Sequence, residues 1–161
     1  MILVYAPQAG RSMEDKEEFY IELRQVTEKI KEEELIMICG DLNGHVGERV
    51  QGFEAVHGGR GFGVRNLEGA MLLEFAEAHK LTVLNTWFVK EDTKKISYES
   101  GGCKTVVDYM LTRQRDRTLV PDVNVIGKES FIPQHKLMIG KLFVREQVKR
   151  KKQVFKSKPK L

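Results

Sequence analysis

Residues 35–43 are Leu-Ile-Met-Ile-Cys-Gly-Asp-Leu-Asn, and the rest of the chain is organised around them. Leu35 to Cys39 is an unbroken apolar run with two isoleucines, which predicts a β-strand buried on both faces. The run stops at Gly40, and an acid and an amide follow it. Residues two apart on an extended backbone point the same way, so we expect Asp41 and Asn43 to project together from the strand end. A strand that runs into an ordinary Asp/Asn/Gly turn would show the same letters.

Length and composition describe one globular domain. The chain has 161 residues, of which 41% are hydrophobic and 31% are charged, and this suits a single domain. No apolar run approaches the length of a membrane span, and the first residues lack the basic flank and the length of a signal peptide. The two cysteines do not suggest a disulfide framework. We therefore expect an intracellular, reducing location and no membrane partner.

The positive charge is concentrated at the C-terminus. The formal net charge is +4, but residues 145–161 hold eight basic residues and one acid, a net +7, which leaves −3 for the other 144 residues. We divide the chain into a domain at 1–144 and a basic tail at 145–161. Because like charges repel and apolar residues are few, we expect disorder beyond about Glu146. The tail is either a solvated segment or a contact for phosphates or nuclear import, through Lys149, Arg150, Lys151 and Lys152.

Hydrophobic spacing along the domain predicts mixed helices and strands. Apolar residues at steps of three and four predict a helix from about Met13 to Glu34, capped at Ser12, with a buried face of Phe19, Leu23, Val26 and Ile30. A second helix is predicted from an N-cap at Asn66 to about His79. Strands are predicted at residues 1–5, 81–85, 96–98, 105–111, 123–126 and 137–144. This mixture indicates an α/β or α+β layered sandwich.

Two more polar residues stand out near predicted strands. Asp108 lies within the apolar segment 106–111, where a carboxylate is costly unless it is paired, hydrogen-bonded or metal-bound. His135 precedes the last strand, where a histidine can be structural, exposed or catalytic. With Asp41 and Asn43 they make a set suited to hydrolysis: Asp108 orients His135, His135 stabilises or protonates a phosphate, Asp41 activates water and Asn43 fixes the phosphate. Mg²⁺ suits such oxygen ligands, and no zinc spacing, P-loop or GxSxG motif is present.

Four short motifs occur in one order along the chain: Tyr5-Ala6-Pro7, Gly-Asp-Leu-Asn at 40–43, Val-Asp-Tyr at 107–109, and Gln134-His135. In these motifs the chain resembles the endonuclease/exonuclease/phosphatase superfamily of Mg²⁺-dependent phosphodiesterases. Residues 61–75 are similar to the endonuclease domains of LINE-type retrotransposons. In this stretch the chain also resembles the craniofacial development protein 2-like group, which carries such a retrotransposon-derived domain.

The resemblance implies a fold and a set of roles. The family fold is a four-layer α/β/β/α sandwich, and this chain would be its C-terminal portion. By position, the implied catalytic residues are Tyr5, Asp41, Asn43, Asp108 and His135. The implied ligands of Mg²⁺ (or Mn²⁺) are Asp41, Asn43 and Gln134. DNA is the implied partner, with contacts expected from Arg11 and from the basic residues 149–152.

The chain departs from the family pattern at three places. Gln134 stands where the family has an acid before its histidine, and Ser97-Tyr98 replaces Thr-Trp. The family's N-terminal part, which holds a metal-binding glutamate, has no counterpart in the 161 residues. We therefore expect weak or absent Mg²⁺-dependent nicking by this chain alone. We also expect self-association through the sheet that the absent strands would cover.

Three functions stay open from the sequence. The first is a Mg²⁺-dependent DNA endonuclease. The second is a catalytically inactive relic that binds nucleic acid or protein. The third is a phosphatase or small-substrate phosphodiesterase of the same fold, because fold alone does not decide substrate. The retrotransposon-like segment favours DNA.

Overall fold

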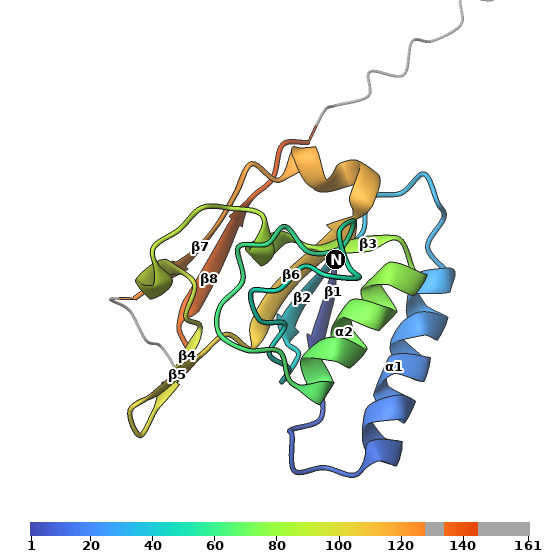
Figure 1. Ribbon diagram of the computed structural model, residues 1–161. Coiled ribbons are helices and arrows are strands. Elements are labelled where there is room, and N and C mark those ends of the chain that lie inside the picture. Colours follow the sequence, from blue (N-terminus) through green and yellow to red (C-terminus); the bar gives the residue numbers. More distant parts are fainter. Residues whose placement is uncertain (128–133, 145–161) are drawn as a thin grey trace, which may run out of the picture.

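A four-stranded sheet forms the centre of the computed structural model, which describes residues 1–127 and 134–144 (Figure 1). The chain order is β1 (Ile2–Tyr5), α1 (Met13–Glu28), β2 (Met37–Asp41), α2 (Leu67–Ala78), β3 (Leu81–Val83), β4 (Tyr98–Ser100), β5 (Cys103–Thr105), β6 (Asp108–Arg113), β7 (Asp122–Ile126) and β8 (Leu137–Lys141). Short 3₁₀ helices lie at η1 (Leu84–Thr86), η2 (Asp92–Lys94) and η3 (Gln114–Leu119). Within the described residues, no helix is long and apolar enough to cross a membrane.

The register of the central sheet brings distant polar residues to one end. The strand order is β1-β2-β6-β3, with β1 parallel to β2 and the other pairs antiparallel. Tyr5 lies opposite Asp41, and Asp41 lies opposite Asp108. Three adjacent strands therefore present these residues in one row.

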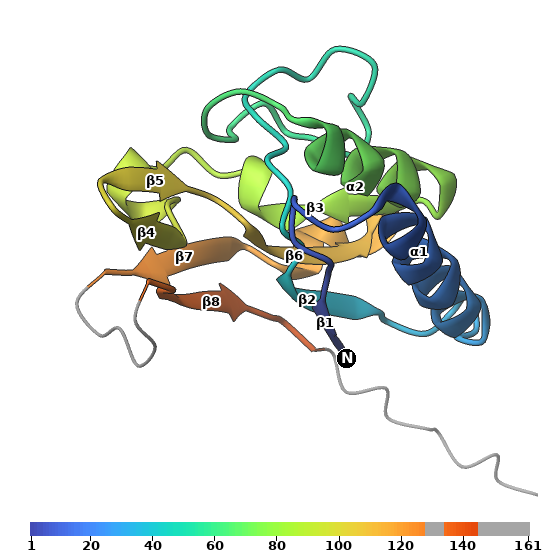
Figure 2. The ribbon, with the colours of Figure 1, turned by 90° about the horizontal axis from the view of Figure 1, so that it is seen from below.

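The layers are those of a mixed α/β sandwich, as the sequence predicts. Helices α1 and α2 cover one face of the central sheet, and the β7–β8 hairpin lies on the opposite side (Figure 2). The main core fills the space between helices and sheet. A smaller core joins the β7–β8 hairpin to the second face of the sheet, through Leu84, Val120, Val123, Met37, Met110 and Met138.

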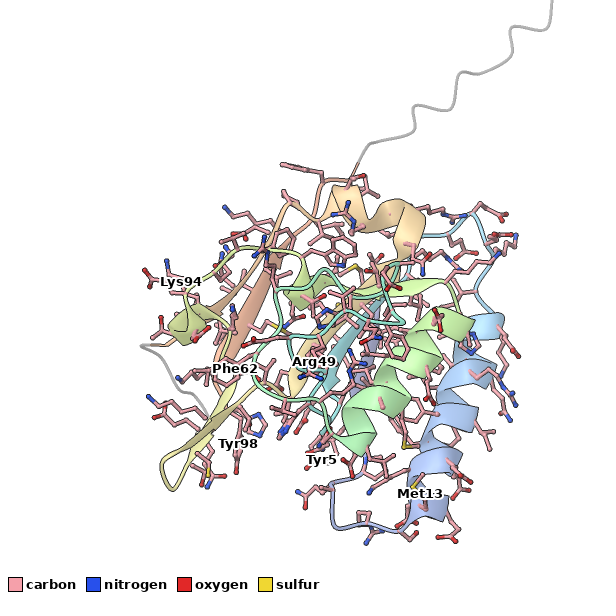
Figure 3. All side chains as sticks on the ribbon, viewed as in Figure 1. Tyr5, Met13, Arg49, Phe62, Lys94 and Tyr98 are labelled. Carbon is pink, nitrogen blue, oxygen red and sulfur yellow. The ribbon has the colours of Figure 1, made fainter. Side chains whose placement is uncertain are left out.

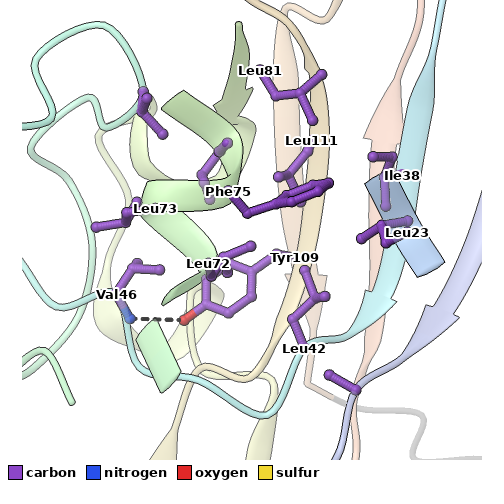
Figure 4. Packing of buried hydrophobic residues seen from close by; sticks show 14 of the residues in the cluster. Leu23, Ile38, Leu42, Val46, Leu72, Leu73, Phe75, Leu81, Tyr109 and Leu111 are labelled. Carbon is purple, nitrogen blue, oxygen red and sulfur yellow. Dashed lines mark hydrogen bonds between the residues drawn. The ribbon is translucent and has the colours of Figure 1, made fainter. Parts of the chain in front are cut away.

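Tyr109 fixes the loop that follows β2. Its ring is fully buried among leucines of α2 and the sheet (Figure 4). Its hydroxyl lies 2.8 Å from the Val106 carbonyl and 2.9 Å from the Gly44 carbonyl, and it accepts the Val46 N–H at 3.3 Å. Burial raises the pKa of Tyr109, so the hydroxyl stays protonated. The loop carrying Asn43 is therefore anchored to β6.

The first helix is shorter than the spacing predicts. Ser12 caps it as expected, with its Oγ accepting the Asp15 N–H at 3.1 Å, but the helix ends at Glu28 rather than Glu34. The Arg113 guanidinium donates to the Ile30, Lys31 and Glu34 carbonyls. These tertiary bonds hold residues 30–34 outside the helix. Val26, expected on the buried face, is 43% exposed.

Strand β2 also differs from its prediction. Ile36 and Ile38 are buried under the helices, but Met37 and Cys39 on the other face are only half-buried. The expectation of a strand buried on both faces is therefore wrong for the described residues. The strand also continues through Gly40 and ends at Asp41, because β1 and β6 pair with it there. Strand β8 ends at Lys141 rather than at residue 144.

Candidate active site

Three ionisable side chains meet at the end of the central sheet. Asp41 ends β2, Asp108 begins β6, and His135 lies two residues before β8. One ligand atom from each lies within 4.8 Å of the others. His135 Nδ1 is 3.2 Å from Asp108 Oδ2, and His135 Nε2 is 3.9 Å from Asp41 Oδ2. Asp41 is the most buried of the three, with 10% of its side chain exposed.

Asp108 sets the orientation of the histidine ring. An ionised carboxylate only accepts hydrogen bonds, so Nδ1 of His135 carries the proton that is shared with Asp108. The Nε2 atom then faces Asp41. The backbone of Asp108 is held in turn, because its N–H donates to Ser97 Oγ at 3.1 Å and its carbonyl accepts from Asn85 Nδ2 at 3.2 Å.

Asn43 reaches the site through a turn and not through strand alternation. Its φ of 48° lies in the left-handed region, and its N–H donates to Asp41 Oδ1 at 2.9 Å. This side-chain turn is typical of Asp. The side-chain Nδ2 of Asn43 donates to the Ala6 carbonyl at 2.7 Å, and this bond ties Asn43 to the end of β1. One oxygen of Asp41 is therefore occupied, and the other faces His135.

The environment of Asp41 favours proton uptake. Burial raises the pKa of Asp41 above its ordinary value, and the nearby Asp108 carboxylate raises it further. The Asn43 N–H and His135 act in the opposite direction. A carboxylate that is easier to protonate is a better base towards water. A cation bound to Asp41 would stabilise its charged form and so offset the effect of burial on its pKa.

A groove of about 600 Å³ runs past these residues. It is lined by Tyr5, Gln8, Ala9, Asp41, Asn43, His45, Asn66, Tyr98, Thr105, Val107, Gln134 and His135. Tyr5 and Tyr98 both lie at the lower end of the molecule in Figure 3. Tyr5 is 64% exposed, and its hydroxyl accepts from Gln8 Nε2 at 3.2 Å. A groove of this size exceeds the space that one phosphate group needs.

The other predicted residues lie farther from this cluster or are otherwise engaged. Gln134 accepts the Tyr98 hydroxyl at 3.1 Å through Oε1 and donates to Ser100 Oγ at 3.0 Å through Nε2. Arg11 pairs with Asp15 at 3.1 Å beside the first turn of α1 and does not line the groove. The basic residues 149–152 and the boundary of the tail lie outside the described residues.

Sequence reasoning missed three supporting residues. Asn85 accepts the Met110 N–H at 2.9 Å as well as contacting Asp108. Its signal was an amide as the last residue of the predicted strand 81–85. Ser97 was noted only as a departure from a family pattern. Its hydroxyl oxygen accepts hydrogen bonds from the backbone N–H groups of Val107 and Asp108. His45, ambiguous from sequence, lines the groove.

The donor set suits a hard divalent cation. Asp41 has one carboxylate oxygen without a hydrogen bond among the described residues, and Asp108 places a further carboxylate oxygen within 4.8 Å. Mg²⁺ and Mn²⁺ favour such oxygen ligands and keep several waters. When bound, such an ion supplies positive charge that stabilises a phosphoryl group under attack.

Solved structures identify the class of fold. The chain superposes with a TM-score of 0.61 and 14% identity on the endonuclease domain of TRAS1, a telomere-specific non-LTR retrotransposon, covering 89% of this chain and 58% of that one. The TM-score is 0.63 with the 3′ phosphatase NExo from Neisseria bound to a product DNA hairpin, at 12% identity over 88% and 60% of the two chains. It is 0.57 with the Xenopus laevis APE2 catalytic domain, at 17% identity over 89% and 50%. The chain has the endonuclease/exonuclease/phosphatase fold, which confirms the resemblance at the level of fold.

Among sequences, the chain is similar to craniofacial development protein 2. It is 29% identical over 143 residues to the protein of Bos taurus, covering 88% of this chain and 24% of the relative. It is 28% identical to the protein of Tragulus javanicus, covering 88% and 25%. The chain thus spans about a quarter of the length of these curated relatives. No family model matches the chain.

Proposed function

We propose that this chain provides the Asp41, Asp108 and His135 portion of a metal-dependent phosphodiesterase site that acts on DNA. The observation that carries the proposal is the cluster itself: two carboxylates and an imidazole within 4.8 Å on a fold of the nuclease type. The three residues of the cluster line a hollow of about 460 Å³ rather than lying on a flat surface. Clustered titratable groups in a groove are typical of catalytic sites.

Each residue has a role that its contacts support. Asp41 takes a proton from the attacking water through its open oxygen. The water oxygen bonds to phosphorus, the P–O ester bond breaks, and the leaving oxygen takes up a proton from solvent, while Asp41 returns its proton to solvent. His135, oriented by Asp108, donates a hydrogen bond from Nε2 to the phosphoryl group in its protonated form. Asn43 and Tyr5 contact the phosphate from the β1 side of the groove.

DNA is the substrate class that the comparisons support best. The TRAS1 domain is an endonuclease, and NExo was solved with a DNA hairpin. The groove of about 600 Å³ is larger than a single phosphate group needs. Action on chromosomal DNA would place the protein in the nucleus, and a retrotransposon origin of the domain would agree with the TRAS1 likeness.

A supercoiled-plasmid assay tests the proposal. We expect nicking with Mg²⁺ or Mn²⁺, none with excess EDTA, and little release of phosphate from a small phosphomonoester. The rate is expected to be low, because Gln134 adds no charge to the two carboxylates. Hydrolysis of the phosphomonoester without nicking would contradict a DNA substrate.

A non-catalytic role is the second candidate, and Gln134 favours it. Gln134 carries no charge, and its amide contacts Tyr98 and Ser100. The cluster in the described residues therefore offers only two carboxylates, those of Asp41 and Asp108, for a cation. A chain that binds duplex DNA in a mobility-shift assay, but never nicks it, would be such a module.

We also propose that the chain self-associates through an open apolar face, formed by Leu3, Leu137 and Ile139. Strand β1 pairs only with β2, and β8 pairs only with β7, so both are edge strands among the described residues. Leu3 is 74% exposed, and Leu137 and Ile139 are each 42% exposed. Apolar edges of this kind promote pairing with another copy.

A double charge substitution tests this face. We expect Leu3→Lys with Ile139→Lys to shift the wild-type oligomer to monomer in light scattering, because lysine on an edge opposes pairing. Ile21→Lys on α1 is the control, because Ile21 is 46% exposed but lies on the helical side. A wild-type chain that is monomeric at high concentration would refute the proposal.

A further inference from the structure

The segment that carries His135 is fastened to strand β4 by its backbone. The Glu99 N–H donates to the Gln134 carbonyl at 2.8 Å, and the Lys136 N–H donates to the Ser97 carbonyl at 2.8 Å. Tyr98 and His135 face each other as an isolated antiparallel bridge. His135 is therefore held from the β4–β5 hairpin as well as from β6.

Side chains reinforce this attachment on both sides of His135. The Tyr98 ring meets the His135 ring edge to face, with centroids 4.9 Å apart and planes at 68°. The Tyr98 hydroxyl donates to Gln134 Oε1, and Gln134 Nε2 donates to Ser100 Oγ. We call Tyr98, Ser100 and Gln134 the latch. The side-chain amide of Gln134, the residue before His135, thus contacts both the first and the last residue of β4.

The backbone of Gln134 is strained. Its φ of 86° lies in the region that favours glycine, and such a conformation is unfavourable for other residues. They persist where surrounding contacts over-determine them, and they cluster at functional sites. The latch supplies these contacts here.

We infer that Tyr98 and Gln134 are positioning residues for His135, and that the hydroxyl and ring of Tyr98 both take part. The inference rests on the proposed function and explains what glutamine does in place of an acid. Asp108 holds the ring at Nδ1, and Tyr98 holds it from the side. His135 is 30% exposed, so without the latch its ring would rotate towards solvent. An imidazole displaced by about 1 Å can lose about 10²-fold in rate.

Kinetics in two backgrounds test the inference. We expect Tyr98→Leu to lower kcat for nicking by about 10- to 100-fold with KM unchanged, and Tyr98→Phe to lose less because its ring remains. In a His135→Ala background, Tyr98→Leu should cost nothing further, because it acts through the histidine. Cys103→Ser, exposed on the same hairpin, is the control and should change nothing. An equal loss in both backgrounds would overturn the inference.

A spectroscopic readout separates this inference from the proposed function. In NMR spectra of the metal-free chain at fixed pH, we expect a nuclear Overhauser contact between the Tyr98 and His135 rings. Gln134→Ala should weaken it and shift the His135 ring signals, whereas Cys103→Ser should not. Unchanged spectra in Gln134→Ala would refute the latch. An altered spectrum in a chain that never nicks DNA would support the latch and refute the catalytic role.

Discussion

Replacing Asp41 with Asn is expected to lower metal-dependent nicking of plasmid DNA by about 10²- to 10⁴-fold. Asparagine has the same shape and can keep an oxygen on the Asn43 N–H, so the turn after β2 should survive. The negative charge that faces His135 at 3.9 Å is lost, and with it the proposed base and one proposed cation ligand. The folded state should not suffer, because burial raises the pKa of Asp41 and so disfavours its charge.

The control for this prediction is Asp15→Asn. It makes the same change in net charge, but Asp15 lies at the start of α1 and pairs only with Arg11 among its charged neighbours. Initial nicking rates across Mg²⁺ and Mn²⁺ concentrations give the comparison. Undiminished nicking in Asp41→Asn would mean either a contaminating nuclease or a site elsewhere in the chain.

Gly40→Ala is expected to destabilise the fold by roughly 2–5 kcal/mol, since overpacking and backbone strain each cost about 1–3 kcal/mol. A Cβ at this position would lie 1.9 Å from the Val4 carbonyl oxygen on the paired strand β1. The φ of 148° is also unfavourable for a side chain. Because the obstacle is backbone, β1 itself must move away, and Tyr5 and Asp41 should move with it.

Urea unfolding followed by circular dichroism measures this effect. Gly10→Ala is the matched control, because a Cβ there meets nothing within 4 Å. A Gly40→Ala chain that cannot be purified in folded form agrees with the prediction. Equal unfolding midpoints for the two variants would contradict it.

Local signals in the sequence were enough for the helix starts and for the order of the elements. Ser12 and Asn66 cap α1 and α2 as predicted, because a side-chain oxygen next to free N–H groups needs no tertiary partner. The mixed α/β class followed from the two hydrophobic periods. Asp41, Asn43 and Asp108 could be named as candidates because each lies within or directly beside an apolar run, where polar side chains are rare.

Other features depend on contacts between distant residues, and the sequence could not show them. The end of α1 is set by Arg113, which lies about 80 residues further along the chain. The half-exposed second face of β2 depends on which strands cover it. The engagement of Gln134 with Tyr98 and Ser100 needs the hairpin to lie beside it, and no spacing rule predicts that.

The sequence separation within the cluster has a consequence for folding. His135 and Asp108 are 27 residues apart, and Asn43 and Ala6, which lie beside them, are 37 apart. Closing such loops is entropically unfavourable, and non-local pairing slows folding. The cluster should therefore be among the last parts to form and the first to open. Among the described residues, the segment that carries His135 is joined to the rest by the backbone of residues 97–99, by the latch, by Asp108 and by the β7–β8 hairpin. Local unfolding of that hairpin would therefore dismantle the cluster while the helices and the central sheet stay folded.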